Sequence, residues 1–123
     1  MLRLDQTDMI ARVAERLRAI ADENRIRLLL ALKEGERTVG TLSEVLGLGQ
    51  ASTSKHLGVL KAAGLVEFRK EGTQCWYRIR DLQVFEMCAM VCQGVVRHIE
   101  AQQAVLRGFE LPAKVGGKKG KAS

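Results

Sequence analysis

Residues 49–80, GQASTSKHLGVLKAAGLVEFRKEGTQCWYRIR, constrain the fold more than any other part of this sequence. They predict a short helix that carries small hydroxyl and cationic side chains, followed directly by a basic β-hairpin. Either element alone is common. In this order, the helix suits insertion into a groove of DNA while the hairpin holds the adjacent phosphates. The pattern is typical of a winged helix-turn-helix.

The sequence before this segment has the periodicity of two further helices. From Asp8 to Ala21 the apolar positions recur every three or four residues, which predicts a helix with one apolar face. Asp22 or Asn24 can cap a second helix, which Gly35 is expected to end. That helix is too apolar for a surface element, so we expect burial of Ile26, Leu28, Leu29, Leu30 and Leu32.

A third short helix is expected before the one that opens the 49–80 segment. Thr38 is its predicted cap, and Val39, Leu42, Val45 and Leu46 are its apolar positions. The break Gly47-Leu48-Gly49 separates it from the fourth helix. Two short helices joined by such a glycine-containing turn form a helix-turn-helix.

The last predicted helix runs from Asp81 to about Arg107. Between residues 84 and 96 nearly every side chain is apolar, VFEMCAMVCQGVV, yet thirteen residues are too few to span a bilayer. A helix that is apolar almost all round needs partners on several sides. We therefore expect a homodimer whose interface is built by this helix and the first one.

These elements define the expected fold class, which is mainly α with some β. We predict a winged helix-turn-helix of five helices and a two-stranded β-hairpin wing, in the order four helices, hairpin, helix. Residues 1–111 are expected to form this one DNA-binding and dimerisation domain, since a chain of 123 residues is too short for two. Residues 112–123 are Gly- and Lys-rich and are expected to be a disordered basic tail.

The positive charge of the chain is concentrated in two places. The formal net charge is +6, and the tail contributes four lysines without an acid. Residues 50–80 contain six basic and two acidic residues, a local charge of +4. This charge favours DNA as the partner of the helix and hairpin. The alternative is a winged-helix module that holds another protein.

Helical geometry divides the fourth helix into two faces. With Leu57 set inward, Thr53 and Leu60 share the core side, while Ser52 and Lys55 lie opposite. Gln50 in the first turn can read adenine, and Ser52 and Lys55 can bond bases or phosphates. In the hairpin, alternation predicts one apolar and one cationic face, with Arg69 and Lys70 near the tip and Arg78 on the returning strand directed at phosphates. Taken alone, the polar helix face could also be an ordinary solvated surface.

Other classes of protein find little support in the sequence. The two histidines and three cysteines form no nucleophile and base arrangement, and no phosphate-binding loop or paired-carboxylate motif occurs, so we do not expect an enzyme. Charged residues interrupt the first twenty positions, which predicts neither a secretion signal nor a membrane anchor. The chain is expected to be cytoplasmic.

The sequence resembles the ArsR/SmtB family of bacterial repressors over roughly residues 10–100. The resemblance rests on ADENRIRLLLAL, on WYRI and above all on the stretch from Gln50 to Val66, QASTSKHLGVLKAAGLV. It implies a homodimer that binds an inverted-repeat operator and is released by an inducer, often a metal ion or a thiol-reactive compound. It also implies DNA contacts at Gln50, Ser52, Ser54 and His56, although helical geometry places Ser54 nearer the core.

The inducer site is the least defined part of the resemblance. The family's arsenic or cadmium cysteines would fall on Thr38 and Gly40, and its zinc ligands on Asp81, Gln83, Gly94 and Arg97, most of which cannot act as ligands. Cys88 and Cys92 remain. Four residues apart on a helix, they suit two ligands of one soft metal or metalloid ion. A redox sensor and simple packing of buried cysteines are the alternatives.

Overall fold

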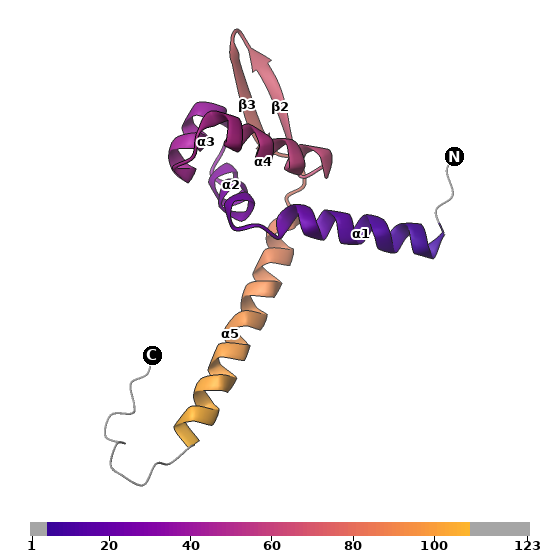
Figure 1. Cartoon of the computed structure of the whole chain (residues 1–123), viewed down its shortest axis with the longest axis vertical. Helices are drawn as coiled ribbons and strands as arrows, with labels where there is room; N and C mark the ends of the chain where they lie inside the picture. The colour runs from indigo at the N-terminus through magenta and orange to yellow at the C-terminus, as the bar shows by residue number, and fades with distance from the viewer. Residues whose placement is uncertain (1–4, 109–123) are drawn as a thin grey trace. The chain divides into compact units, whose positions relative to one another are not determined.

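The computed structural model of the chain describes residues 5–108, which form five α-helices and three β-strands (Figure 1). The predicted tail, residues 112–123, lies outside the described residues. The chain divides into two compact units, the first ending at Leu82 and the second beginning at Gln83. The first unit holds the winged helix-turn-helix, and the second holds the last helix.

Helices α1 (Gln6–Ile20) and α2 (Glu23–Lys33) both begin at a capping aspartate. The carboxylate of Asp5 accepts the Asp8 backbone N–H at 2.8 Å, and that of Asp22 accepts the Arg25 backbone N–H at 3.1 Å. Each bond satisfies one of the amides that a helix start leaves unpaired. Asp22, and not Asn24, is therefore the cap of the second helix.

Helices α3 (Val39–Leu46) and α4 (Gln50–Ala62) form the helix-turn-helix. The predicted Thr38 cap is confirmed, since its Oγ1 accepts the Thr41 backbone N–H at 3.3 Å. Gly47 ends α3 with φ of 70°, a left-handed conformation that glycine adopts without strain. Gly49 caps α4 without a side-chain hydrogen bond.

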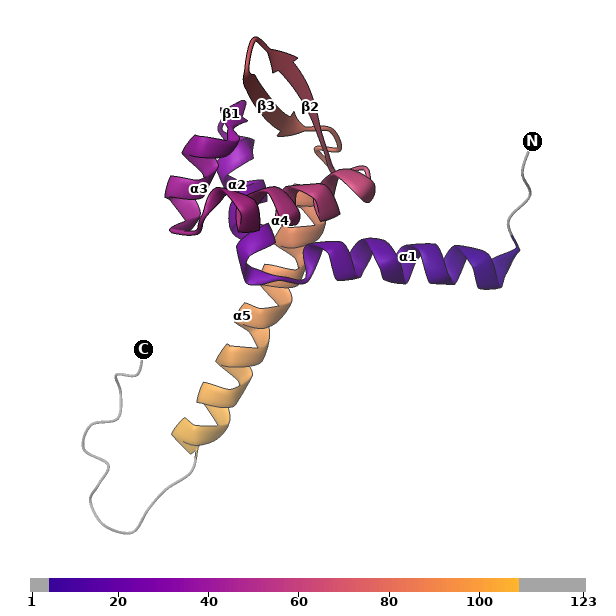
Figure 2. The ribbon, with the colours of Figure 1, turned by 45° about the horizontal axis from the view of Figure 1, so that its top comes forward.

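The sheet has three strands where the sequence predicts two. Strands β2 (Val66–Glu71) and β3 (Gln74–Ile79) form the predicted hairpin, and a two-residue strand β1 (Arg37–Thr38) pairs with the other edge of β3 (Figure 2). All pairing is antiparallel, with Arg37 opposite Tyr77 and Phe68 opposite Tyr77. Strand β1 thus fastens the start of α3 to the base of the wing.

The core of the first unit is made mainly of leucines from α2, α3 and α4, together with Leu65 and Val66 at the start of the hairpin. The fully buried side chains are Leu28, Leu29, Leu42, Leu57, Leu60, Leu65, Val66 and Thr53. The prediction for α2 was partly wrong, because Ile26 and Leu30 are 37% and 51% exposed. The apolar run of α2 is longer than the part of the helix surface that packs on the core, so these two side chains lie on its solvent side.

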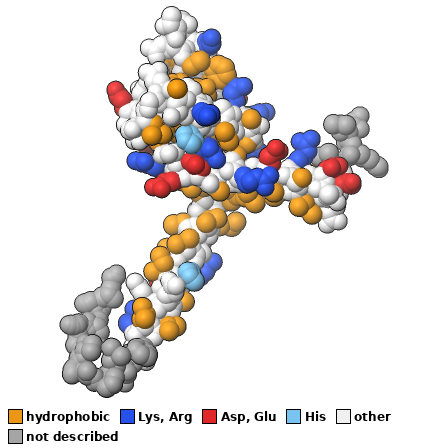
Figure 3. Space-filling view, in the orientation of Figure 1, with side chains coloured by type: hydrophobic (Ala, Val, Ile, Leu, Met, Phe, Trp, Pro, Cys, Tyr) orange, Lys and Arg blue, Asp and Glu red, His pale blue; other side chains and the backbone are white. Residues whose placement is uncertain are grey.

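Helix α5 (Val84–Gly108) begins three residues later than predicted. Most of its apolar side chains are exposed in this single chain, and Figure 3 shows them along the helix. Among the described residues, no helix combines the length and apolarity that crossing a membrane requires.

Candidate nucleic-acid interface

Helix α4 is fixed to the first unit by one buried face. Thr53, Leu57 and Leu60 are fully buried, as helical geometry predicts. The Thr53 hydroxyl donates to the Gly49 carbonyl oxygen at 2.9 Å, so its polar atom is satisfied inside the core. A helix held in this way presents its other side chains in a fixed orientation.

Four exposed residues of α4 can bond to DNA: Gln50, Ser52, Ser54 and Lys55. Ser54, which helical geometry places nearer the core, is exposed in the structure. Ser54 directly follows the buried Thr53, so it lies at the border between the buried and the exposed side of α4. The N-terminal half of α4 therefore presents hydroxyl, amide and ammonium groups, the types that bond to base edges and phosphates.

Gln50 lies where α4 begins, close to the start of α3. A β-carbon at Gly40 would lie 3.7 Å from the Gln50 amide nitrogen and 3.9 Å from Thr38 Oγ1. Gly40 thus leaves room for this amide beside α3 at ordinary van der Waals distance. The side chain is exposed, so its amide is available to a base in the groove.

His56 is directed toward α2 and is only partly accessible. Its Nδ1 lies 3.1 Å from Arg25 Nη1 and 4.0 Å from Asp22 Oδ1. Arginine can only donate, so Nδ1 accepts and the proton of the neutral ring is on Nε2. The hydrogen bond from the backbone N–H of Arg25, with a smaller contribution from the Arg25 charge, lowers the pKa of Asp22. His56 therefore links α4 to α2, and only Nε2 is left for DNA.

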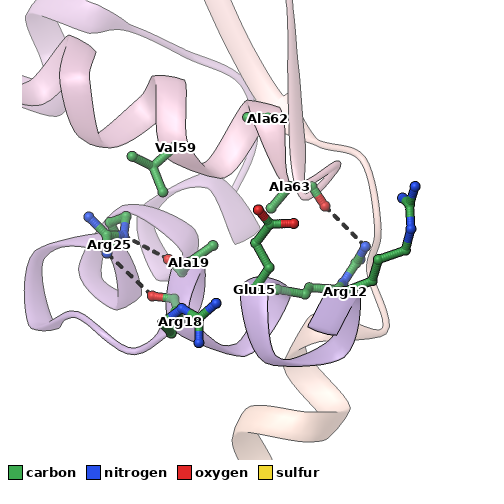
Figure 4. Close-up of a pocket in the computed structure, with 9 residues that line it drawn as sticks. Arg12, Glu15, Arg18, Ala19, Arg25, Val59, Ala62 and Ala63 are labelled. Atoms are coloured by element: carbon green, nitrogen blue, oxygen red, sulfur yellow. Dashed lines mark hydrogen bonds between the residues drawn. The ribbon is translucent and has the colours of Figure 1, made fainter. Parts of the chain in front are cut away.

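Two arginines connect α1 with α2 and with the end of α4. Arg25 donates to the carbonyl oxygens of Ala19 at 2.7 Å and Arg18 at 3.4 Å, and Arg16 donates to that of Ala63 at 3.0 Å (Figure 4). Arg16 also pairs with Asp81. These bonds join α1, α2 and the end of α4.

A pocket of about 540 Å³ lies beside these two arginines. Its polar wall is made of Arg12, Arg16, Arg18, Arg25 and Glu15, and its apolar wall includes Val59, Ala62 and Ala63 of α4. Figure 4 shows Glu15 of α1 pointing toward Ala63 at the end of α4. Two of these guanidinium groups donate to backbone carbonyls, Arg16 to the end of α4 and Arg25 to the end of α1.

The wing face predicted to be cationic is neutralised by acids. Arg69 Nε and Nη2 donate to the two carboxylate oxygens of Glu36 at 3.2 and 3.0 Å, and its Nη1 donates to Glu71 at 3.1 Å. Arg78 donates to Glu67 at 2.7 Å and lies 3.8 Å from Glu36. Two arginines thus face three glutamates, so this cluster has a net charge of −1 and the predicted cationic face is incorrect.

Lys70 lies on the other face of the hairpin. Strand pairing places it opposite Cys75, on the same side as Phe68 and Tyr77, whose rings stack at 5.3 Å. Lys61 of α4 lies over the Phe68 ring at 5.3 Å. Lys70 itself is exposed. The wing therefore separates its basic residues, with the ion-paired Arg69 and Arg78 on one face and Lys70 on the face nearer α4.

The three cysteines lie on two different elements, one on β3 and two on α5. Cys75 is half-buried on β3, while Cys88 is half-buried and Cys92 exposed on α5, and all three are free thiols. Within residues 5–108, no three His, Cys, Asp or Glu side chains come close enough to hold a metal ion. A metal site at Cys88 and Cys92 would need ligands from another molecule.

Sequence reasoning missed Glu36, which organises the wing cluster. A two-residue strand is too short to show the alternation that identifies strands, so nothing marked Glu36 as a neighbour of the hairpin. The pairing of His56 with Arg25 was missed because it joins residues 31 positions apart. The only available signal was the presence of acidic residues near a basic hairpin.

The sequence and the fold match known bacterial regulators. A family model for bacterial regulatory proteins of the arsR family matches residues 22–67, from the cap of α2 into β2. The biofilm growth-associated repressor of Xylella fastidiosa is 34% identical over 87 residues, which are 71% of this chain and 76% of that protein. This chain belongs to the ArsR family.

Two other similarities extend this assignment. An HTH-type transcriptional regulator of Mycobacterium tuberculosis is 38% identical over 84 residues, but this chain spans only 36% of its length. The homodimeric winged helix-turn-helix DNA-binding domain of a Mycobacterium bovis protein superposes with a TM-score of 0.69 at 32% identity, covering 82% of this chain and 95% of that one. As an ArsR-family protein with this fold, the chain is a DNA-binding transcriptional regulator.

Proposed function

We propose that this chain is a homodimeric repressor that places α4 in the major groove of an operator. The observation that carries the proposal is the division of α4 into a fully buried face and an exposed N-terminal half with Gln50, Ser52, Ser54 and Lys55. A rigidly held helix with small polar residues at its N-terminal end fits the groove and bonds to base edges. Lys70 supplies a wing contact to phosphate.

The other proposed contacts come from groups that already have partners within the chain. His56 can reach DNA through Nε2, whereas Arg69 and Arg78 are paired with carboxylates that compete with a phosphate. We therefore assign sequence reading to α4 and a conditional role to the two wing arginines. Their contacts with phosphate would position the protein without reading sequence.

A second copy of this chain is the proposed partner of the exposed apolar side chains. On α1 these are Met9, Ile10, Val13 and Leu17, and on α5 they are Met90, Val91, Val95, Val96 and Ile99. Contiguous exposed apolar side chains of this kind favour association. The homodimeric structure of the Mycobacterium bovis relative supports this partner. Two-fold symmetry of the protein implies an operator with inverted-repeat symmetry.

For the inducer we propose the thiols of Cys88 and Cys92 on α5. Both are free and one is exposed, and their spacing suits one thiophilic metal or metalloid ion, or oxidation by a thiol-reactive compound. In a dimer, the second copy could supply the ligands that one chain lacks. The competing explanation, in which the cysteines only pack in the dimer interface, is tested by substitution.

Salt dependence of duplex binding tests the central proposal. Affinity for duplex DNA should fall roughly 100-fold or more between about 50 and 200 mM salt, because lysines and arginines displace condensed counterions. Fluorescence anisotropy of a labelled duplex measures this directly. Absence of duplex binding even at low salt would favour the alternative, a winged-helix module that binds another protein.

A further inference from the structure

Arg69 has three of its five N–H donors bonded to carboxylates in the free protein. Its Nε and both terminal nitrogens bond to Glu36 and Glu71, and the pair with Glu36 is bidentate. Bidentate arginine–carboxylate pairs are the best oriented of charged hydrogen bonds. The hydrogen bonds from Arg69 lower the pKa of Glu36, so this carboxylate stays charged at neutral pH.

The carboxylate of Glu36 has the chemistry of the ligand that Arg69 would otherwise bind. A DNA phosphate, like a carboxylate, offers two oxygens to the fork of a guanidinium and carries one negative charge. Glu36 is also within 3.8 Å of Arg78, the other wing arginine. One acidic side chain thus lies against both wing arginines of this face.

Glu36 belongs to the helix-turn-helix side of the structure and not to the hairpin. It directly precedes β1, which leads into α3, while Arg69 and Arg78 lie on β2 and β3. With 29% of its side chain exposed, it is less accessible than Arg69 at 45% or Glu71 at 65%. The Glu36 carboxylate is therefore held at the base of the wing, where an approaching phosphate must compete with it.

We propose that Glu36 is an internal phosphate mimic that sets the DNA affinity of this regulator by occupying Arg69 and Arg78 until a DNA backbone displaces it. The proposal rests on the proposed DNA-binding function and adds a residue that restrains it. Non-specific DNA, which is held by phosphate contacts alone, gains least from arginines that must exchange a partner. Binding to an operator provides base contacts at α4 that can offset this exchange. Glu36 thereby favours specific over non-specific binding.

The test compares the complete chain with Glu36→Gln on a random-sequence duplex across a salt series. Glutamine keeps the size of the side chain and removes its charge. We expect Glu36→Gln to bind roughly 3- to 10-fold tighter at low salt, with a salt slope steeper by about 0.9 for each arginine released to phosphate. Adding Arg69→Gln to Glu36→Gln should abolish most of this gain.

Glu44→Gln is the matched control. Glu44 is exposed on α3 and forms no ion pair with any described residue, so its substitution removes the same charge without releasing an arginine. A gain no larger for Glu36→Gln than for Glu44→Gln, or a gain that survives Arg69→Gln, overturns the proposal. If Glu36→Gln does not fold, as judged by circular dichroism, Glu36→Ala removes the same carboxylate from Arg69 and Arg78 and gives the same comparison.

The possible outcomes distinguish a failure of the role proposed for Glu36 from a failure of the proposed DNA-binding function. Duplex binding by the wild type without a selective gain in Glu36→Gln contradicts the role of Glu36 alone. Absence of duplex binding by both proteins contradicts the DNA-binding function as well.

Discussion

Two buried hydroxyl groups in the helix-turn-helix have opposite surroundings. Thr53 is fully buried and donates to a backbone carbonyl, whereas the buried Ser43 Oγ has no hydrogen-bond partner among the described residues. A buried polar group without a partner loses its hydration and gains nothing in return. At the scale of single residues, Ser43 is therefore a point of weakness in α3.

Ser43→Ala should raise the free energy of unfolding by about 1 kcal/mol, because the unpaired hydroxyl is removed from the core. Urea unfolding at fixed protein concentration measures the change. Ser54→Ala, on the exposed face of α4, controls for the better helix propensity of alanine. A loss of stability in Ser43→Ala relative to this control would mean that the hydroxyl has a stabilising role.

The burial of single residues could be predicted from the sequence where helical periodicity decides which side chains face the core. The inward placement of Thr53, Leu57 and Leu60 follows from helical geometry alone and is confirmed. Sequence reasoning failed for Glu36 and for the His56 partner, because ion pairs between segments distant in sequence leave no local pattern. The wing charge was therefore counted correctly in the sequence but not placed correctly in space.

At the scale of elements, the four helices of the first unit and the hairpin were all predictable from caps, glycines and apolar spacing. Strand β1 was not, because two residues between a glutamate and a helix cap carry no alternation. It pairs with β3 through tertiary packing, and sequence patterns describe local preferences better than such pairing. Its addition matters, since β1 brings Glu36 to the wing.

Helix α5 is the element on which the sensing proposal can be tested. Replacing Cys88 and Cys92 with serine should leave DNA binding intact but abolish release by cadmium, arsenite or a persulfide, since serine is a poor ligand for soft ions and does not oxidise. Cys75→Ser is the control. Release that persists unchanged in the double variant removes both cysteines from the mechanism, and a wild type that none of these compounds releases supports packing.

At the scale of the whole molecule, the proposed activity depends on two copies. A single chain leaves apolar side chains of α1 and α5 exposed, and one α4 can contact only one half of an inverted repeat. The net charge of +6 gives a general attraction to DNA. This attraction is not selective, so recognition of one operator must come from the exposed face of α4.

The central claim is that this face reads bases, and the ratio of operator to non-operator affinity tests it most directly. An operator would be selected from random duplexes with the wild type, and both affinities would then be measured for wild type, Gln50→Ala and the control Gln102→Ala on exposed α5. We expect Gln50→Ala to reduce this discrimination by about 1–3 kcal/mol, or roughly 5- to 150-fold, while Gln102→Ala leaves it unchanged. Equal discrimination by the wild type and Gln50→Ala would contradict the assignment of α4 as the reading element.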